Sequence, residues 1–221
     1  MMRRRTQSSG ALLVAAALAA ALSGRPALAE PAPLDDDGLG ASPYGRMQML
    51  LEKTFLKIDV LSVEVRFAPE TAGALRVLAE GHRRSAELTE QIAERASRAG
   101  DAYVEIRFLR DVGLDEFLAG VTRNLERATR AGMLDQDSLR RISSELPRWF
   151  AFLEERGIRS GDRLLYRARP ASLRTVYVDR AGEVLLDQTD QGSTPTRALL
   201  AGYFAPGSDF VNGLVASLFR G

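Results

Sequence analysis

Residues able to do chemistry are few in this chain, and their spacing matches no catalytic motif. The sequence has one histidine, His82, and no cysteine, which excludes paired-histidine zinc motifs, thiolate nucleophiles and cysteine-based metal sites. His82 stands beside Arg83 and Arg84 at a predicted helix break, which favours a surface role over that of a general base. No nucleophile elbow, phosphate-binding glycine loop or dinucleotide fingerprint occurs. We therefore predict no catalytic residue set, no metal and no organic cofactor.

An arginine near the end of a predicted strand is a candidate for holding an anion. Arg107 and Arg110 bracket two apolar residues there, and Asp111 follows at once. If Arg107 faces a helical layer at the edge of the sheet, its planar guanidinium can hold a carboxylate through two parallel hydrogen bonds. The alternative is an ordinary ion pair of Arg107 with Asp111 or Glu105.

The first 29 residues have the three parts of a cleavable export signal. Arginines occupy positions 3–5, an unbroken apolar run of twelve residues covers 11–22, and small residues at Ala27 and Ala29 flank a cleavage point. The apolar run is shorter than the about 20 residues that a helix needs to cross a membrane. We therefore predict a signal peptide over 1–29 and an exported protein, periplasmic or secreted, with no stable membrane span after cleavage.

The charge of the exported part argues against nucleic acid as a partner. The whole sequence has 30 basic and 29 acidic residues, but residues 1–29 hold four of the arginines and none of the acids. Their removal leaves 26 basic and 29 acidic residues, a net charge of −3. Nucleic-acid binding favours a clustered basic surplus. We therefore predict no nucleic-acid partner.

Composition divides the exported part into a leader and one domain. Residues 30–43 hold three prolines, two glycines and the acidic run 35–37, which predicts a flexible leader with a solvated acidic tail. The remainder, 44–221, has the length of a single domain that buries most of its apolar surface.

Hydrophobic periodicity within 44–221 switches several times between strand and helix. Period-two patterns predict strands over 54–67, 102–109, 163–169, 173–179 and 183–188. Helical spacing and capping residues predict helices over 70–99 with a break near 81–82, and over 114–129, 138–145, 148–156, 196–204 and 209–219. This order predicts an α+β domain in which a layer of helices covers one face of a mostly antiparallel sheet.

Four passages stand in an order and spacing typical of one fold family: Phe55–Val63, Ile106–Val112, Gly161–Leu164 and Ala198–Phe204. They resemble, in turn, the first core strand, the strand before the central helix, the Gly-Asp entry to the meander and the C-terminal helical pair of the chalcone isomerase fold family, especially its bacterial exported chalcone-isomerase-like branch. The resemblance covers roughly 44–219. It implies an open-faced sandwich with a ligand cleft between sheet and helices.

The same resemblance implies that the plant enzymes' catalytic groups are mostly missing here. Their helical tyrosine, lysine and asparagine fall on Phe117, Gly120 and Asn124, so only the asparagine survives. Their first-strand threonine falls on Leu56, and an arginine that precedes that strand falls near Arg46. Because Leu, Phe and Gly cannot donate hydrogen bonds from their side chains, a developing enolate would not be stabilised.

The implied cleft is therefore apolar with a cation at its mouth, which suits a fatty acid better than a polyphenol. Non-catalytic members of the family resemble this pattern and bind fatty acids. We predict a non-catalytic protein whose partner is a small apolar or fatty-acid-like ligand. The candidate contacts are Arg46 or Arg107 for an anionic head group, Asn124 as a polar contact, and Phe117, Leu56 and Leu118 as the apolar wall.

Two alternatives remain open from the sequence. The first is an isomerase or intramolecular lyase of the chalcone isomerase type that uses other donors, such as Tyr103, Tyr166 or Tyr177, with a hydroxyl in the same cleft as an arginine. The second is a ligand-free interaction module of the envelope. It predicts a cleft filled by the protein's own side chains and a contiguous exposed apolar patch elsewhere.

Overall fold

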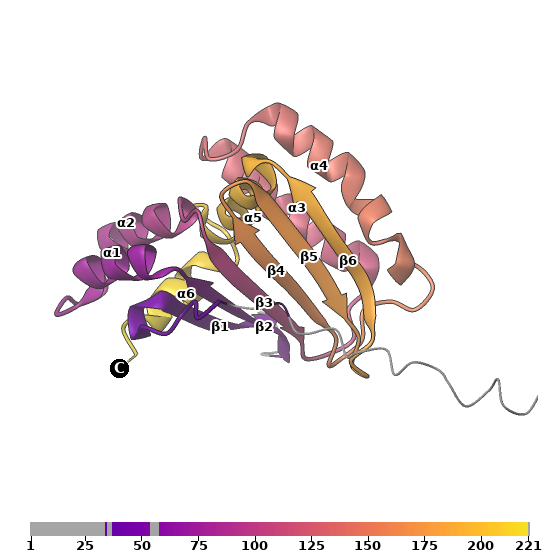
Figure 1. Ribbon diagram of the computed structural model, residues 1–221, viewed down its shortest axis with the longest axis horizontal. Helices are drawn as coiled ribbons and strands as arrows, with labels where there is room; N and C mark the ends of the chain where they lie inside the picture. The colour runs from indigo at the N-terminus through magenta and orange to yellow at the C-terminus, as the bar shows by residue number, and fades with distance from the viewer. Residues whose placement is uncertain (1–33, 35–36, 54–57, 221) are drawn as a thin grey trace, which may run out of the picture. The chain divides into compact units, whose positions relative to one another are not determined.

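Six antiparallel strands form one sheet whose spatial order follows the chain (Figure 1). The computed structural model describes residues 34, 37–53 and 58–220, so the predicted signal peptide lies outside the described residues. The strands are β1 (Arg46–Lys53), β2 (Ile58–Phe67), β3 (Ala102–Phe108), β4 (Arg163–Arg169), β5 (Ser172–Val178) and β6 (Val184–Gln191). Every neighbouring pair is antiparallel, because short hairpins join β4 to β6 and the helical segments return the chain to the adjacent edge.

The helices supply the second layer of the domain. They are α1 (Pro69–Ala79), α2 (Ala86–Ser97), α3 (Leu114–Arg130), α4 (Gln136–Trp149), α5 (Ser193–Phe204) and α6 (Val211–Ser217), with short 3-10 turns η1 (Pro43–Gly45) and η2 (Ala151–Leu153). The break between α1 and α2 confirms the predicted split. The helix predicted over 148–156 is absent, because α4 continues through Pro147 in its last turn and only η2 follows. The α+β class with a helical layer is confirmed.

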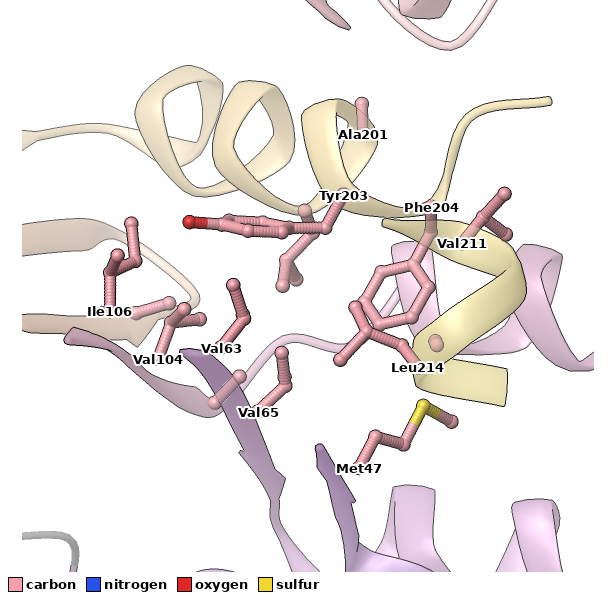
Figure 2. Packing of buried hydrophobic residues seen from close by; sticks show 14 of the residues in the cluster. Met47, Val63, Val65, Val104, Ile106, Ala201, Tyr203, Phe204, Val211 and Leu214 are labelled. Carbon is pink, nitrogen blue, oxygen red and sulfur yellow. The ribbon is translucent and has the colours of Figure 1, made fainter. Parts of the chain in front are cut away.

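The main core lies between the sheet and the helices. Alternate residues of the strands point to this side, and Figure 2 shows Val63 and Val65 of β2 and Val104 of β3 beneath the C-terminal helices. Phe204 of α5 is 1% exposed, and its ring lies 6.0 Å from that of Phe67 at the end of β2. These contacts fix α5 over the middle of the sheet.

The first strand, β1, has no counterpart among the strands that the sequence predicts. Its helix-facing side chains are Met47 and Met49, and the unbranched methionines give a weak strand signal. Helix α6 lies on this edge strand, where the backbone N–H of Gln48 donates to Ser217 Oγ at 3.0 Å. A Cβ atom placed on Gly213 of α6 would lie 2.8 Å from Met49 Sδ and 3.0 Å from Met49 Cβ, so a larger residue there would force the Met49 side chain to move.

Gly213→Ala is expected to lower the free energy of unfolding by about 1–3 kcal/mol, because the added methyl group overpacks the contact with Met49. The matched control is Gly73→Ala in α1, where a Cβ atom meets no neighbour within 4 Å. That control is expected to stabilise the protein by about 0.5–1 kcal/mol, the ordinary gain from glycine to alanine in a helix. Urea unfolding of both variants tests the contact, and two equal changes would contradict it.

Part of the predicted leader packs on the other face of the sheet. Leu34 and Leu39 are 7% and 6% exposed, and they join a second apolar cluster with Tyr103, Leu165, Val176 and Val178. Asp37, expected from composition to be solvated, accepts hydrogen bonds from Arg167 Nη2 at 2.8 Å and Arg169 Nη2 at 2.9 Å. These residues therefore belong to the folded unit, while residues 30–33 and 35–36 lie outside the described residues.

Candidate functional site

The structure separates the two predicted cations from the predicted apolar wall. Arg107 alternates with the core residues Ile106 and Phe108, so it lies on the sheet face that carries the second cluster. Its Nη2 lies 3.5 Å from Glu105 Oε1, which is the ion pair considered as the alternative from the sequence. The parity of the strand therefore places Arg107 on the face opposite the helices.

Arg46 lies on that same face and pairs with Glu64 of the neighbouring strand. Its side chain is 50% exposed, so it faces solvent on the side of the sheet opposite the helices. Arg46 therefore does not face the layer between sheet and helices. Leu56, the apolar contact predicted in the first strand, lies outside the described residues.

Phe117 of α3 fills the space where the sequence predicts an apolar wall. It is 9% exposed, and its ring makes edge contacts with Phe108 at 5.9 Å and with Phe150 at 5.2 Å between centroids. Leu118 is half-buried and packs on the same core. Both residues therefore line a packed interior at this end of the layer.

Asn124, the polar contact predicted on α3, is 5% exposed and has a structural partner. Its Oδ1 accepts hydrogen bonds from Arg127 Nη1 at 2.8 Å and from the backbone N–H of Asp209 at 3.3 Å. Arg127 also pairs with Asp209. This network ties α3 to the loop before α6, and it holds the helical layer together.

Asp162 is the most strongly hydrogen-bonded carboxylate among the described residues, and it is fully buried. It accepts from Arg156 Nη1 and Nη2 at 2.8 and 3.3 Å, from Tyr177 Oη at 2.7 Å, and from the backbone N–H groups of Arg159 and Arg180 at 2.8 and 3.0 Å. Burial alone would raise the pKa of this carboxyl, but the hydrogen bonds outweigh burial and lower it. Because every acceptor position is used, the cluster is structural.

Two other tyrosines present hydroxyl groups that have no such partner. Tyr166 lies on β4 opposite Val104, on the helix-facing side, and Tyr203 of α5 is 6% exposed. Figure 2 shows the Tyr203 ring extending from α5 along the layer towards Ile106. Within the described part of the chain, neither hydroxyl makes a hydrogen bond.

These two hydroxyls interact electrostatically and remain reachable. Burial raises the pKa of Tyr166 and of Tyr203, and the neighbouring Tyr166 raises that of Tyr203 further. Both are therefore neutral donors throughout the physiological pH range. Within the described ranges, the side-chain polar atoms that are fully buried and make no hydrogen bond are Ser143 Oγ and Arg167 Nε. The hydroxyl oxygens of Tyr166 and Tyr203 make no hydrogen bond either but are not among these atoms, so they keep some solvent-accessible surface.

The Tyr166–Tyr203 pair is thus the candidate site between sheet and helices. Of the tyrosines singled out in the sequence, Tyr177 donates to Asp162, and the Tyr103 ring lies on the other face, 5.3 Å from Arg66 Cζ. Tyr203 was missed because it reads as part of an apolar C-terminal helix. Its only signal is that a tyrosine hydroxyl in such a helix needs a partner when buried.

Neither a metal site nor a membrane span is found in the part of the chain that the structure describes. No three His, Asp or Glu side chains there gather closely enough to hold a metal ion. None of the described helices combines the length and the apolar character that crossing a membrane demands.

Comparison with known proteins finds similarity in three-dimensional structure and none in sequence family. No family model matches the chain, and no curated protein matches it. Among solved structures, the crystal structure of a fatty-acid binding protein of Arabidopsis thaliana is similar, with a TM-score of 0.46 and 14% sequence identity. The match covers 80% of this chain and 89% of that chain.

Proposed function

We propose that this chain is an exported, non-catalytic binding protein for an apolar ligand with a hydrogen-bond acceptor at one end, such as a fatty acid. The observation that carries the proposal is that Tyr166 and Tyr203 lie among apolar residues between sheet and helices, and that their hydroxyls make no hydrogen bond within the described residues. A hydroxyl that loses its water to a bound ligand and gains no new acceptor costs about 1–3 kcal/mol. A ligand with an acceptor within reach of these donors avoids that cost.

The surroundings of the pair select a neutral head group. No cation contributes to the raised pKa of Tyr166 or Tyr203, and the predicted cations Arg46 and Arg107 lie on the opposite face. A carboxylate transferred into such a layer loses its hydration, which raises its pKa. We therefore propose that a fatty acid binds in its protonated form, and that esters and alcohols of the same chain length bind as well.

The same chemistry argues against catalysis by this pair. A tyrosine whose pKa is raised by burial holds its proton, so neither hydroxyl is a competent general base near neutral pH. Export remains a proposal that rests on the signal-like residues 1–29. The periplasm and the outside medium are both compatible with it.

The double variant Tyr166→Phe/Tyr203→Phe is expected to weaken binding of palmitic acid by about tenfold or more, because two hydrogen bonds of about 0.5–1.5 kcal/mol each are lost. The unliganded double variant is expected to be about as stable as the wild type, because neither hydroxyl makes a hydrogen bond within the described residues that the variant would lose. Isothermal titration calorimetry and urea unfolding measure the two quantities. Tyr103→Phe, on the other face of the sheet, is the control and should leave binding unchanged.

A direct test precedes the variants. The protein purified gently from its own host is measured by native mass spectrometry, and any bound small molecule is identified. An apolar ligand at about one per chain supports the proposal. Purification without a bound ligand, together with no binding of added fatty acids or esters, would contradict the proposal.

One observation favours the interaction module as a second candidate function. The layer around Phe117 is filled by the protein's own aromatic rings, as that alternative predicts. The described ranges hold only three exposed large apolar side chains, Leu50, Val77 and Leu109, too few for the contiguous apolar patch that this alternative also predicts. The ligand-binding proposal therefore stands first.

A further inference from the structure

A hollow of about 390 Å³ lies where the turn between α1 and α2 meets the C-terminal end of the chain. Helix α2 contacts α6, so this turn lies beside the C-terminal helix (Figure 1). The hollow is lined by Tyr44, Ala79, His82, Arg83, Arg84, Leu218 and Phe219. Neither the Tyr166–Tyr203 pair nor any residue predicted to bind ligand belongs to it.

Uncompensated cations form the rim of this hollow. Within the described ranges, Arg83 has no hydrogen bond or ion pair, and the one partner of Arg84 is the backbone oxygen of Asn212, 3.4 Å from its Nη1. That contact anchors Arg84 to α6 and leaves its charge unneutralised. His82 Nδ1 lies 3.0 Å from the backbone oxygen of Glu80. Because a carbonyl only accepts, Nδ1 carries the proton and Nε2 is left for another partner.

A second hollow of similar volume differs from this one in how its arginines are paired. It lies between residues 111–114 and 153–159 and also contains two arginines. There Arg156 pairs with Asp162 at 2.8 Å and Arg159 pairs with Asp111 at 2.9 Å. The charges in that hollow are compensated, whereas those of Arg83 and Arg84 are not.

The floor of the hollow is apolar. Ala79 is 4% exposed, and Tyr44, Leu218 and Phe219 are half-buried residues that pack on the main core. The rings of Tyr44 and Phe219 contribute apolar surface to the same hollow that Arg83 and Arg84 line. A hydrated inorganic ion gains little from such a floor, but an organic body carried on an anion loses apolar surface to it.

We infer that this hollow binds a small organic oxyanion, a carboxylate or a phosphate monoester, with a short apolar or aromatic body. Guanidinium groups match both oxyanions through paired hydrogen bonds, and the positive end of the α2 dipole lies directly after Arg84, at the Ser85 N-cap. The volume is near the lower end of the about 300–1,000 Å³ typical of ligand sites, so the body is the size of one ring. The inference is independent of the proposed fatty-acid site.

Arg83→Gln/Arg84→Gln is expected to weaken the binding of benzoate and phenyl phosphate by about tenfold or more, the cost of one to two charge-assisted hydrogen bonds. The matched control is Arg130→Gln/Arg141→Gln, which removes two exposed arginines of α3 and α4 outside the hollow. NMR titration of the full chain measures both. An equal loss in the two double variants would overturn the inference, because the effect would then be one of net charge.

Two further experiments test the apolar contact and the type of oxyanion separately. Phe219→Leu and Phe219→Ala are expected to weaken phenyl phosphate binding by about two- to tenfold and to leave the weaker binding of inorganic phosphate unchanged. A preference for benzoate or for phenyl phosphate then identifies the oxyanion. Binding of inorganic phosphate as tight as that of phenyl phosphate overturns the apolar part. No binding of any probe up to about 10 mM overturns the site itself.

Discussion

Asp162→Ala is expected to lower the free energy of unfolding by about 3–5 kcal/mol, because it leaves a buried hydroxyl and a half-buried guanidinium without their acceptor. The lost groups are Arg156, which donates from both Nη atoms, and Tyr177, whose hydroxyl lies 2.7 Å from Asp162 Oδ2. Two backbone N–H groups lose the same acceptor. Chemical unfolding monitored by circular dichroism measures the change.

The control for this variant is Asp111→Ala in the adjacent segment. Asp111 also accepts from an arginine and from a backbone N–H, namely Arg159 Nη1 and Ser160 N, each at 2.9 Å. Its side chain is 59% exposed, so water replaces the lost partner and the expected cost is about 1 kcal/mol or less. An equal loss of unfolding free energy in Asp162→Ala and Asp111→Ala would mean that the buried hydrogen bonds of Asp162 contribute no more to stability than the exposed ones of Asp111.

Acid unfolding provides an independent signature of the same carboxylate. Because the folded pKa of Asp162 is lowered below its unfolded value, its contribution is complete above about pH 4, the ordinary aspartate pKa, and is lost as pH falls through the folded pKa. The wild type should therefore lose stability more steeply below about pH 4 than Asp162→Ala does.

The elements with strong local signals could be predicted from the sequence. The β4–β6 meander follows period-two patterns bounded by turn residues, and α3 has apolar residues at helical spacing, so their existence is fixed locally. The strand β1 was not predicted, because its partners β2 and α6 are what define it. The predicted division into helices over 138–145 and 148–156 is wrong, because α4 continues through Pro147 to Trp149.

The candidate site could be predicted only in part, because a site depends on which face of the sheet or helix each residue occupies as well as on the residue types. One residue of register decides whether Arg107 or Phe108 faces the helices, and the sequence pattern alone left Arg107 open. Asn124 is polar and buried on the expected helix, but its partner Asp209 is distant in sequence. Tyr166 and Tyr203 lie on β4 and α5, two elements distant in sequence whose packing no local pattern encodes.

Phe117→Ala is expected to lower the free energy of unfolding by about 3–5 kcal/mol, the usual range for an aromatic ring removed from a packed core. Phe117 is 9% exposed and makes edge contacts with two other rings, so its truncation leaves a cavity that the rigid sheet cannot close. Leu109→Ala is the control. Leu109 is 37% exposed, and its truncation should cost about 0.5 kcal/mol or less.

The same variant decides what the layer between sheet and helices is at this end. An apolar cavity of ring size stays dry and accepts benzene, so benzene should raise the melting temperature of Phe117→Ala and leave that of the wild type unchanged. Such a result means that the protein's own aromatic ring occupies the space in which a wall for ligand was expected, and that ligand entry is confined to the side of Tyr166 and Tyr203. Equal stabilisation of the wild type by benzene would mean that the layer is already open at Phe117.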